Sequence, residues 1–171
     1  MRIIVCTGMG EPKFSTNLGM IRALKSIGHE VVTCGSGYWN RMNETDILLE
    51  DKPFPEQYEY REILNRAPWV PDLILQIEPH CWLMGEKPQG IFSACWLIDP
   101  HRGAAGYHPL VKAGGFDMLF NAQYHFLPLF EDLAPQVWLP IGFDEIRFSK
   151  DLVMEPVCDV SFIGQTGLAG L

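Results

Sequence analysis

The sequence has no hydrophobic run long enough to cross a membrane. Its longest apolar runs have the length of a β-strand, whereas a membrane-spanning helix needs about 20 consecutive apolar residues. At the N-terminus, "MRIIVCTG" has a charge and a short apolar run, but its glycine comes too early for a secretory signal peptide. We therefore expect a cytoplasmic protein without a membrane span.

Basic residues are also few. The chain has 13 lysines and arginines against 21 aspartates and glutamates, which gives a formal net charge of −8. No cluster of lysine and arginine is longer than two residues. Proteins that bind nucleic acid through its phosphates need such clusters to displace counterions. The sequence therefore predicts no nucleic-acid partner.

Cysteines number only five, and no two of them form a CxxC pair. Cys6, Cys34 and Cys95 fall inside apolar, strand-like runs, where cysteine commonly serves as a small buried hydrophobic residue. The number and spacing predict neither a disulfide framework nor a structural zinc site. Nothing else in the sequence requires a metal or a tightly bound cofactor.

Strand and helix patterns alternate along the 171 residues, of which 47% are hydrophobic. The predicted strands are 2–7, 31–34, 73–78, 91–98, "FDMLFNA" (116–122) and "QVWLP" (136–140). The predicted helices are 15–27, 55–65, 107–114 and 123–132. Continuously apolar strands indicate a sheet that is covered on both faces. We therefore expect an α/β fold: a doubly wound, mainly parallel Rossmann-like sheet of about six strands with helices on both faces.

The first predicted helix lies in "FSTNLGMIRALKSIGHE". Ser15 or Thr16 can cap its N-terminus, and Gly28 stands where a C-terminal glycine belongs. The apolar stripe of this helix comprises Leu18, Ile21, Leu24 and Ile27.

Histidines and carboxylates gather after the predicted strands. In an open parallel sheet, ligands bind outside the carboxyl ends of the strands. Four of the five histidines lie in the segments after the third, fourth and fifth strands. Such an edge can supply a general base and hydrogen bonds to a polyol or similar ligand. The candidate site residues are Gly8, Gly10, Glu11, Glu78, His80, Asp99, His101, Arg102, Asn121 and His125.

Each candidate also has a purely structural interpretation. Asp99 precedes a proline and could cap a turn, and His101 could be a solvated loop histidine. Glu78 and His80 flank Pro79 and could belong to a turn, whereas His125 lies near a predicted helix start.

The glycines after the first strand do not complete a dinucleotide-binding motif. "GMGEPK" has Lys13 where the third glycine of that motif belongs. Gly8 and Gly10 therefore indicate either close approach of a polar ligand or a tight turn.

Four stretches together resemble one enzyme family. "ALKSIGHEVV" (23–32), "LPIGFDEIRF" (139–148) and "CDVSFIGQTG" (158–167) resemble segments of GT-B fold glycosyltransferases. "CWLIDPHRG" (95–103) resembles the spore-maturation-protein-like branch, whose members carry an aromatic strand ending in an acidic turn. The resemblance covers most of the chain, with residues 38–70 the least recognisable.

The resemblance implies two domains with different roles. In that family the N-terminal domain holds the acceptor and often contributes a catalytic base, and the C-terminal domain holds the nucleotide-sugar donor. Asp99 or His101 would be the base. The acceptor, a small molecule or a glycan, would be bound by Gly8, Gly10, Glu11, Glu78, His80, Arg102, Asn121 and His125.

The expected domain boundary follows from the same resemblance. Residues 1–150 would form the acceptor-side domain, and 151–171 a linker and the first strand of a C-terminal donor-binding domain that is missing. The chain alone is then expected to be inactive, with a nucleotide sugar as co-substrate of the complete enzyme. The apolar strand at 159–163 would then be unpaired, and we expect it to be disordered, to add to a neighbouring sheet or to mediate a homodimer.

Two other functions agree with the same residues. One is a non-catalytic Rossmann-like binding or assembly module. The other is a nucleotide-dependent enzyme of another class that uses "TGMG" as a phosphate loop, although the acidic Glu11 disfavours it.

Overall fold

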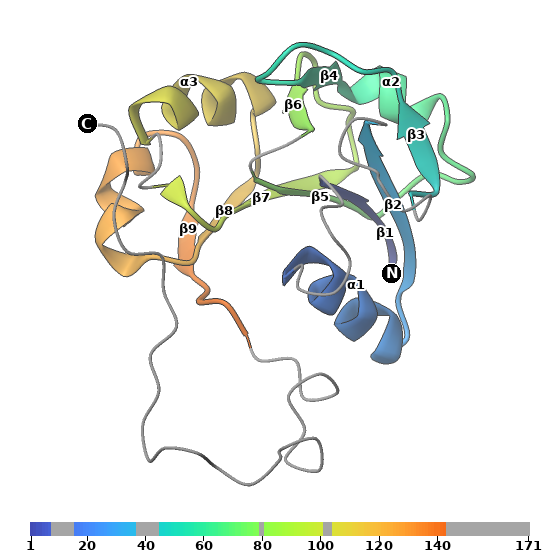
Figure 1. The fold of residues 1–171 in the computed structure, drawn as a ribbon, viewed down its shortest axis with the longest axis horizontal. Helices are drawn as coiled ribbons and strands as arrows, with labels where there is room; N and C mark the ends of the chain where they lie inside the picture. The colour runs from blue at the N-terminus through green and yellow to red at the C-terminus, as the bar shows by residue number, and fades with distance from the viewer. Residues whose placement is uncertain (8–15, 37–44, 79–80, 101–103, 143–171) are drawn as a thin grey trace, which may run out of the picture. The chain divides into compact units, whose positions relative to one another are not determined.

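The computed structural model describes residues 1–7, 16–36, 45–78, 81–100 and 104–142. At its centre is a seven-stranded sheet (Figure 1). In spatial order the strands are β3 (Ile47–Leu49), β2 (Glu30–Ser36), β1 (Arg2–Cys6), β5 (Leu73–Ile77), β7 (Phe92–Leu97), β8 (Met118–Asn121) and β9 (Gln136–Trp138). Every neighbouring pair is parallel. The predicted parallel α/β sheet is confirmed, with one strand more than expected, β3.

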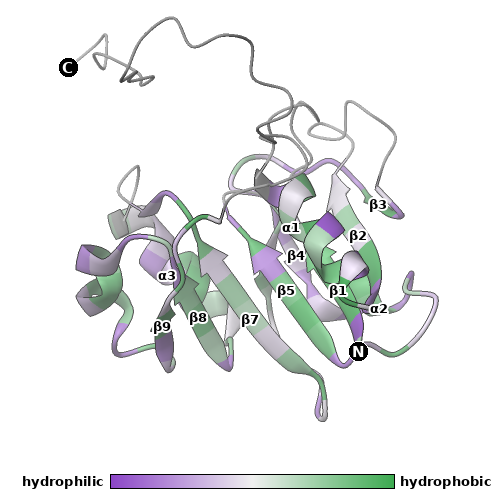
Figure 2. Cartoon of the chain, turned by 90° about the horizontal axis from the view of Figure 1, so that it is seen from below, coloured by the Kyte–Doolittle hydropathy of each residue, from purple (hydrophilic) through white to green (hydrophobic). Residues whose placement is uncertain are grey.

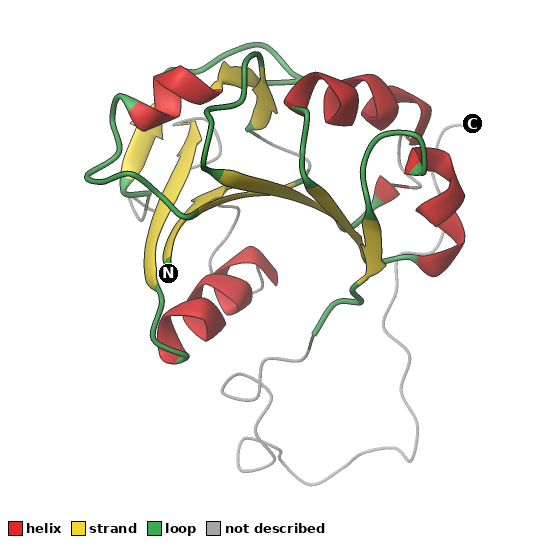
Figure 3. Ribbon diagram, turned by 180° about the vertical axis from the view of Figure 1, so that it is seen from behind, coloured by secondary structure: helices red, strands yellow, loops and turns green. Residues whose placement is uncertain are grey.

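Helices cover both faces of this sheet, as seen in Figures 1 and 3. On one face lies α1 (Thr16–Ser26). The opposite face is covered by α2 (Tyr60–Leu64), α3 (Ala104–Gly114) and a parallel strand pair of β4 (Gln57–Glu59) and β6 (Trp82–Met84).

The alternation of side chains in β1 explains why its sequence is continuously apolar. Ile3 and Val5 belong to the core on the α1 face, and Ile4 and Cys6 to the core on the other face. All four are 0% exposed. Figure 2 shows the hydrophobic character of the central strands.

Helix α1 ends one residue earlier than its apolar stripe predicts. Leu18 and Ile21 are buried and Leu24 is half-buried against them, but Ile27 lies beyond Ser26 and is 70% exposed. Nine residues after Leu18 a helix has turned to the opposite side, because each residue adds about 100°. Gly28 ends the helix as predicted, with φ +89° and its N–H donated to the carbonyl of Lys25 at 3.1 Å.

The helix predicted over 55–65 is wrong in its first half. Residues Gln57–Glu59 form strand β4, which pairs with β6, and only Tyr60–Leu64 are helical. Glu59 is extended, with φ −71° and ψ 144°, and its N–H donates to the Glu62 carboxylate at 3.1 Å. This local cap fixes where the helix begins.

The helix predicted over 123–132 is shorter and of another type. Tyr124–Phe130 form a 3₁₀ helix, η2, which contains Pro128. Proline has no N–H to donate inside a helix, and this favours a short, tight turn over a longer α-helix.

Residues Met1–Ile141 form one compact unit. Within the described ranges, none of the helices is both long enough and apolar enough to span a bilayer. The predicted domain boundary after residue 150 and the predicted strand at 159–163 lie outside the described residues and stay predictions.

Candidate functional site

The carboxyl ends of the strands share one edge of the sheet because all the strands are parallel. The strand order reverses between β1 and β5, so these two strands flank the switch point at which such sheets bind ligands. Thr7 follows β1, and its hydroxyl accepts a hydrogen bond from the side-chain amide of Asn17 at 2.5 Å. That bond joins the first turn of α1 to this edge.

A close backbone approach shapes the same edge. Gly35 of β2 lies against Thr7, and a Cβ atom at position 35 would lie 2.5 Å from the Thr7 carbonyl oxygen. The N–H of Thr7 donates to the carbonyl of Cys34 at 2.9 Å. Only glycine permits β1 and β2 to stay paired up to this point.

Glu78 and Asp99, both predicted site residues, are brought together. Glu78 directly follows β5 and is 2% exposed. Its Oε1 accepts a hydrogen bond from the backbone N–H of Asp99, the second residue after β7. The Glu78 N–H in turn donates to the carbonyl of Trp96 at 3.2 Å. The buried carboxylate therefore fixes the turn that carries the half-buried Asp99 side chain.

Asn121 lies beside this pair, at the end of β8 and in register with Leu97 of β7. It is 0% exposed, and its Oδ1 accepts the backbone N–H of Gln123 at 3.0 Å. In the described part of the chain, its Nδ2 has no hydrogen-bond partner. Buried amide donors are normally paired, so this group is available to a polar atom that reaches it.

Gln123, which follows β8, links the turn after that strand to the turn after β7. Its side-chain amide donates to the carbonyl of Ile98 at 3.2 Å, next to Asp99. The turns after β7 and β8 are thus joined by a side chain as well as by the sheet. A rigid support of this kind is what a positioned base requires.

His125 does not join the buried carboxylate. It is exposed on η2, and its ring lies against that of Phe126 with centroids 4.5 Å apart. No contact of His125 with Glu78, Asp99 or Asn121 is found in the described part of the structure, and its predicted role in binding stays a prediction.

The remaining predicted site residues lie outside the described residues. Both the second candidate base and the glycine loop are among them. They are Gly8, Gly10, Glu11, His80, His101 and Arg102.

A buried polar pair at the end of β2 was not predicted. The Ser36 hydroxyl lies 3.0 Å from each carboxylate oxygen of Glu56, and both residues are 2% exposed. The carbonyl of Glu56 accepts the N–H of Trp82 at 2.8 Å, which ties it to β6. Glu56 comes from the irregular region before β4, where the sequence has no periodic pattern that would indicate burial.

A cluster of three cysteines was missed as well. Cys6, Cys34 and Cys81 are buried, and their sulfur atoms lie within 4.8 Å of one another. Hydrogen bonds from Cys6 and Cys81 lower the pKa of Cys34 to about 5. Burial of Cys34 acts to raise this pKa but has the smaller effect. The hydrogen bond to Cys34 raises the pKa of Cys6 and of Cys81. Cys34 is therefore the first of the three to lose its proton.

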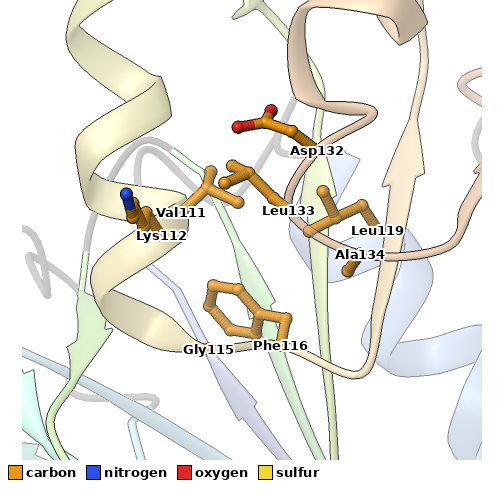
Figure 4. A pocket seen from close by; sticks show the side chains of 8 residues that line it. All are labelled: Val111, Lys112, Gly115, Phe116, Leu119, Asp132, Leu133 and Ala134. Atoms are coloured by element: carbon orange, nitrogen blue, oxygen red, sulfur yellow. The ribbon is translucent and has the colours of Figure 1, made fainter.

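A small pocket lies away from these residues (Figure 4). It has a volume of about 170 Å³ and is mainly apolar. Its lining residues are Val111, Lys112, Gly115, Phe116, Leu119, Asp132, Leu133 and Ala134. Gly115 and Phe116 precede β8, so the pocket is near the amino end of that strand. Small-molecule sites usually measure about 300–1,000 Å³, so we do not assign a substrate to it.

Comparisons of this chain with protein-family models, with curated proteins and with solved structures found no match.

Proposed function

We propose that this chain is the acceptor-binding half of a glycosyltransferase, which moves a sugar from a nucleotide-sugar donor to a hydroxyl group. The observation that carries the proposal is the buried Glu78 carboxylate, which holds the turn of Asp99 at the carboxyl end of the central strands. Ligands of doubly wound sheets bind at this edge. The resemblance of four sequence segments to GT-B enzymes supports the reaction class.

Asp99 is the proposed general base. Its side chain is half-buried, so it is accessible to an acceptor while its backbone is fixed by Glu78. A base of this kind must come within about 2.6–3.2 Å of the hydroxyl whose proton it removes. His101 remains the alternative base, because it follows Asp99 by two residues in the sequence.

Glu78 and Asn121 have different proposed roles. Glu78 is a positioning residue, because it is buried and its Oε1 accepts a hydrogen bond from the backbone N–H of Asp99. The Asn121 amide can donate a hydrogen bond to an acceptor hydroxyl, since its Nδ2 has no partner in the described part of the chain.

The donor would bind to a second domain. We expect that domain after residue 150, and we expect the 171 residues alone not to bind the nucleotide. The proposed transfer requires no metal. Its partners would be a small-molecule or glycan acceptor and the donor-binding domain.

Heat-flow calorimetry of the 171-residue chain with a panel of nucleotide sugars and nucleotides tests this proposal. We expect no saturable heat from any donor. Saturable donor binding would contradict the acceptor-side assignment and favour a nucleotide-dependent enzyme of another class. If the chain, once joined to its donor-binding domain, binds a glycan but never transfers a sugar to it, a non-catalytic binding module is favoured.

A further inference from the structure

Three cysteines from distant parts of the sequence form one compact group. Cys6 and Cys34 are cross-strand partners in the parallel pair of β1 and β2. Cys81 directly precedes β6 and joins them on the same face of the sheet. All three are at most 1% exposed, and their sulfur atoms lie within 4.8 Å of one another.

The backbone at Cys81 provides a second, independent observation. Its φ is +58°, and it is the one non-glycine residue with positive φ among those that the structure describes. The left-handed region disfavours residues with a Cβ atom, and strained backbone tends to occur at functional sites. Glycine would avoid this strain but would remove the thiol from the group. The conformation is therefore consistent with a requirement for sulfur at this position.

The spacing of the sulfur atoms suits a metal ion. Zinc–sulfur bonds are about 2.3 Å long, so three thiolates around one ion lie about 3.8–4.0 Å apart. The sulfur atoms are at most 4.8 Å apart, and they reach the metal-bound spacing if each sulfur moves inward by about 0.5 Å. Side-chain adjustment alone can supply such a movement.

The type of donor narrows the choice of ion. Thiolates are soft ligands that select Cu⁺ and Zn²⁺ over the oxygen-preferring ions Mg²⁺ and Ca²⁺. No fourth cysteine, histidine or carboxylate joins the group within the ranges described by the structure.

We propose that Cys6, Cys34 and Cys81 bind one thiophilic metal ion, Cu⁺ or Zn²⁺, through three thiolates. On binding, the cysteines that still carry a proton release it to solvent, and the ion forms three metal–sulfur bonds. The ion joins the carboxyl ends of β1 and β2 to the segment that begins β6. It lies beneath the edge formed by Thr7, which follows β1, and Ser36, which ends β2, so its role is to fix that edge. This site does not depend on the proposed glycosyl transfer.

The test is metal titration of the reduced, metal-free 171-residue chain. Cu⁺ and Zn²⁺ are added in separate experiments, each buffered by a chromophoric chelator, and native mass spectrometry counts the ions bound. We expect one ion per chain, and the two titrations show which ion is bound more tightly.

The variants are chosen to separate the cluster from ordinary buried thiols. Cys34→Ala and Cys81→Ala are each expected to weaken binding by at least about a hundredfold, since each removes a ligand. Cys95→Ala is the matched control, because Cys95 is also 0% exposed in the same core but is outside the group. It should bind the ion as the wild type does.

X-ray absorption of the metal-loaded wild type keeps the proposal testable if a variant does not fold. Three sulfur neighbours at about 2.3 Å are expected for zinc. The proposal is overturned if the wild type binds neither ion, if Cys95→Ala loses binding as Cys34→Ala does, or if the ion has fewer than three sulfur neighbours.

Discussion

At the scale of single residues, the proposed transfer depends most on Asp99. In the proposed complete enzyme, replacing Asp99 by Asn should reduce turnover by about a hundredfold or more, because the amide cannot accept the proton of the acceptor. The hydrogen bond to Glu78 should be kept, since it is made by the backbone N–H of residue 99, which asparagine retains. Steady-state kinetics with circular dichroism measures both effects.

A matched control for this substitution lies at the opposite edge of the sheet, where the strands begin. Asp72 precedes β5, and its carboxylate accepts the N–H of Arg2 at 2.7 Å. Asp72→Asn should leave turnover unchanged. Near-normal turnover of Asp99→Asn would remove Asp99 from the role of base.

Glu78 should affect stability more strongly than Asp99 does. Glu78→Ala removes a buried carboxylate and leaves the Asp99 N–H without its acceptor, which should lower the free energy of unfolding by about 2–4 kcal/mol. Glu78→Gln keeps an oxygen acceptor and should cost less. Urea denaturation of the two variants tests this, and equal losses would show that the hydrogen bond to Asp99 contributes little.

The sequence indicated some of these residues and not others, for a physical reason. Glu78, Asp99 and Asn121 directly follow apolar strands, so the rule for parallel sheets places them at one edge. Glu56 and Cys81 come from segments with no periodic pattern, and nothing in the sequence shows which strand they meet. The three cysteines are far apart in the sequence and are brought together by tertiary packing. Spacing rules for zinc motifs therefore do not predict the group.

At the scale of elements, the pairing of β1 with β2 depends on Gly35. In Gly35→Ala the new Cβ would overlap the Thr7 carbonyl oxygen, and we expect the free energy of unfolding to fall by about 1–3 kcal/mol. Gly106→Ala is the control, because position 106 is inside α3 with no atom within 4 Å of the added Cβ. That variant should gain up to about 1 kcal/mol from helix propensity. Chemical denaturation of both variants measures these changes in the free energy of unfolding. If Gly35→Ala is as stable as the wild type, the strands can separate there at no cost.

An ion pair at the amino ends of β7 and β8 should make stability depend on pH. Burial acts to raise the pKa of Asp117, but the Lys87 ammonium and the Ser93 N–H, at 2.8 Å, outweigh it and lower that pKa. A lowered carboxyl pKa stabilises the fold above the unfolded value of about 3.9, and this stabilisation is lost as the pH falls through the folded value.

Asp117→Asn isolates that contribution. At pH 7 it should lower the free energy of unfolding by about 1–2 kcal/mol, and the difference from the wild type should shrink below about pH 4. Urea denaturation across this pH range measures it. A difference between the two proteins that stays constant with pH would contradict the assignment.

Elements with strong periodicity could be predicted, and those set by local contacts could not. The strands with continuous apolar runs and the glycine end of α1 agree with the structure. The short β4 and the 3₁₀ helix η2 do not agree, because β4 is fixed by pairing with β6 and η2 contains Pro128. Neither cause is visible as a repeat in the sequence.

At the scale of the whole molecule, the parallel sheet follows from the sequence because every strand buried on both faces reads as an apolar run. The function does not follow from the fold, since the same sheet serves many chemistries. The proposed function requires that a hydroxylated ligand binds at the edge formed by β5, β7 and β8.

The most direct measurement is an amide NMR titration of the isotopically labelled 171-residue chain with sugars and glycosides, and separately with nucleotide sugars. We expect sugars to shift the signals of residues 77–78, 97–99 and 121–123, and nucleotide sugars to cause no saturable shifts, because their binding domain is proposed to lie after residue 150. Saturable shifts from free nucleotides, centred on Thr7 and the first turn of α1, would contradict it.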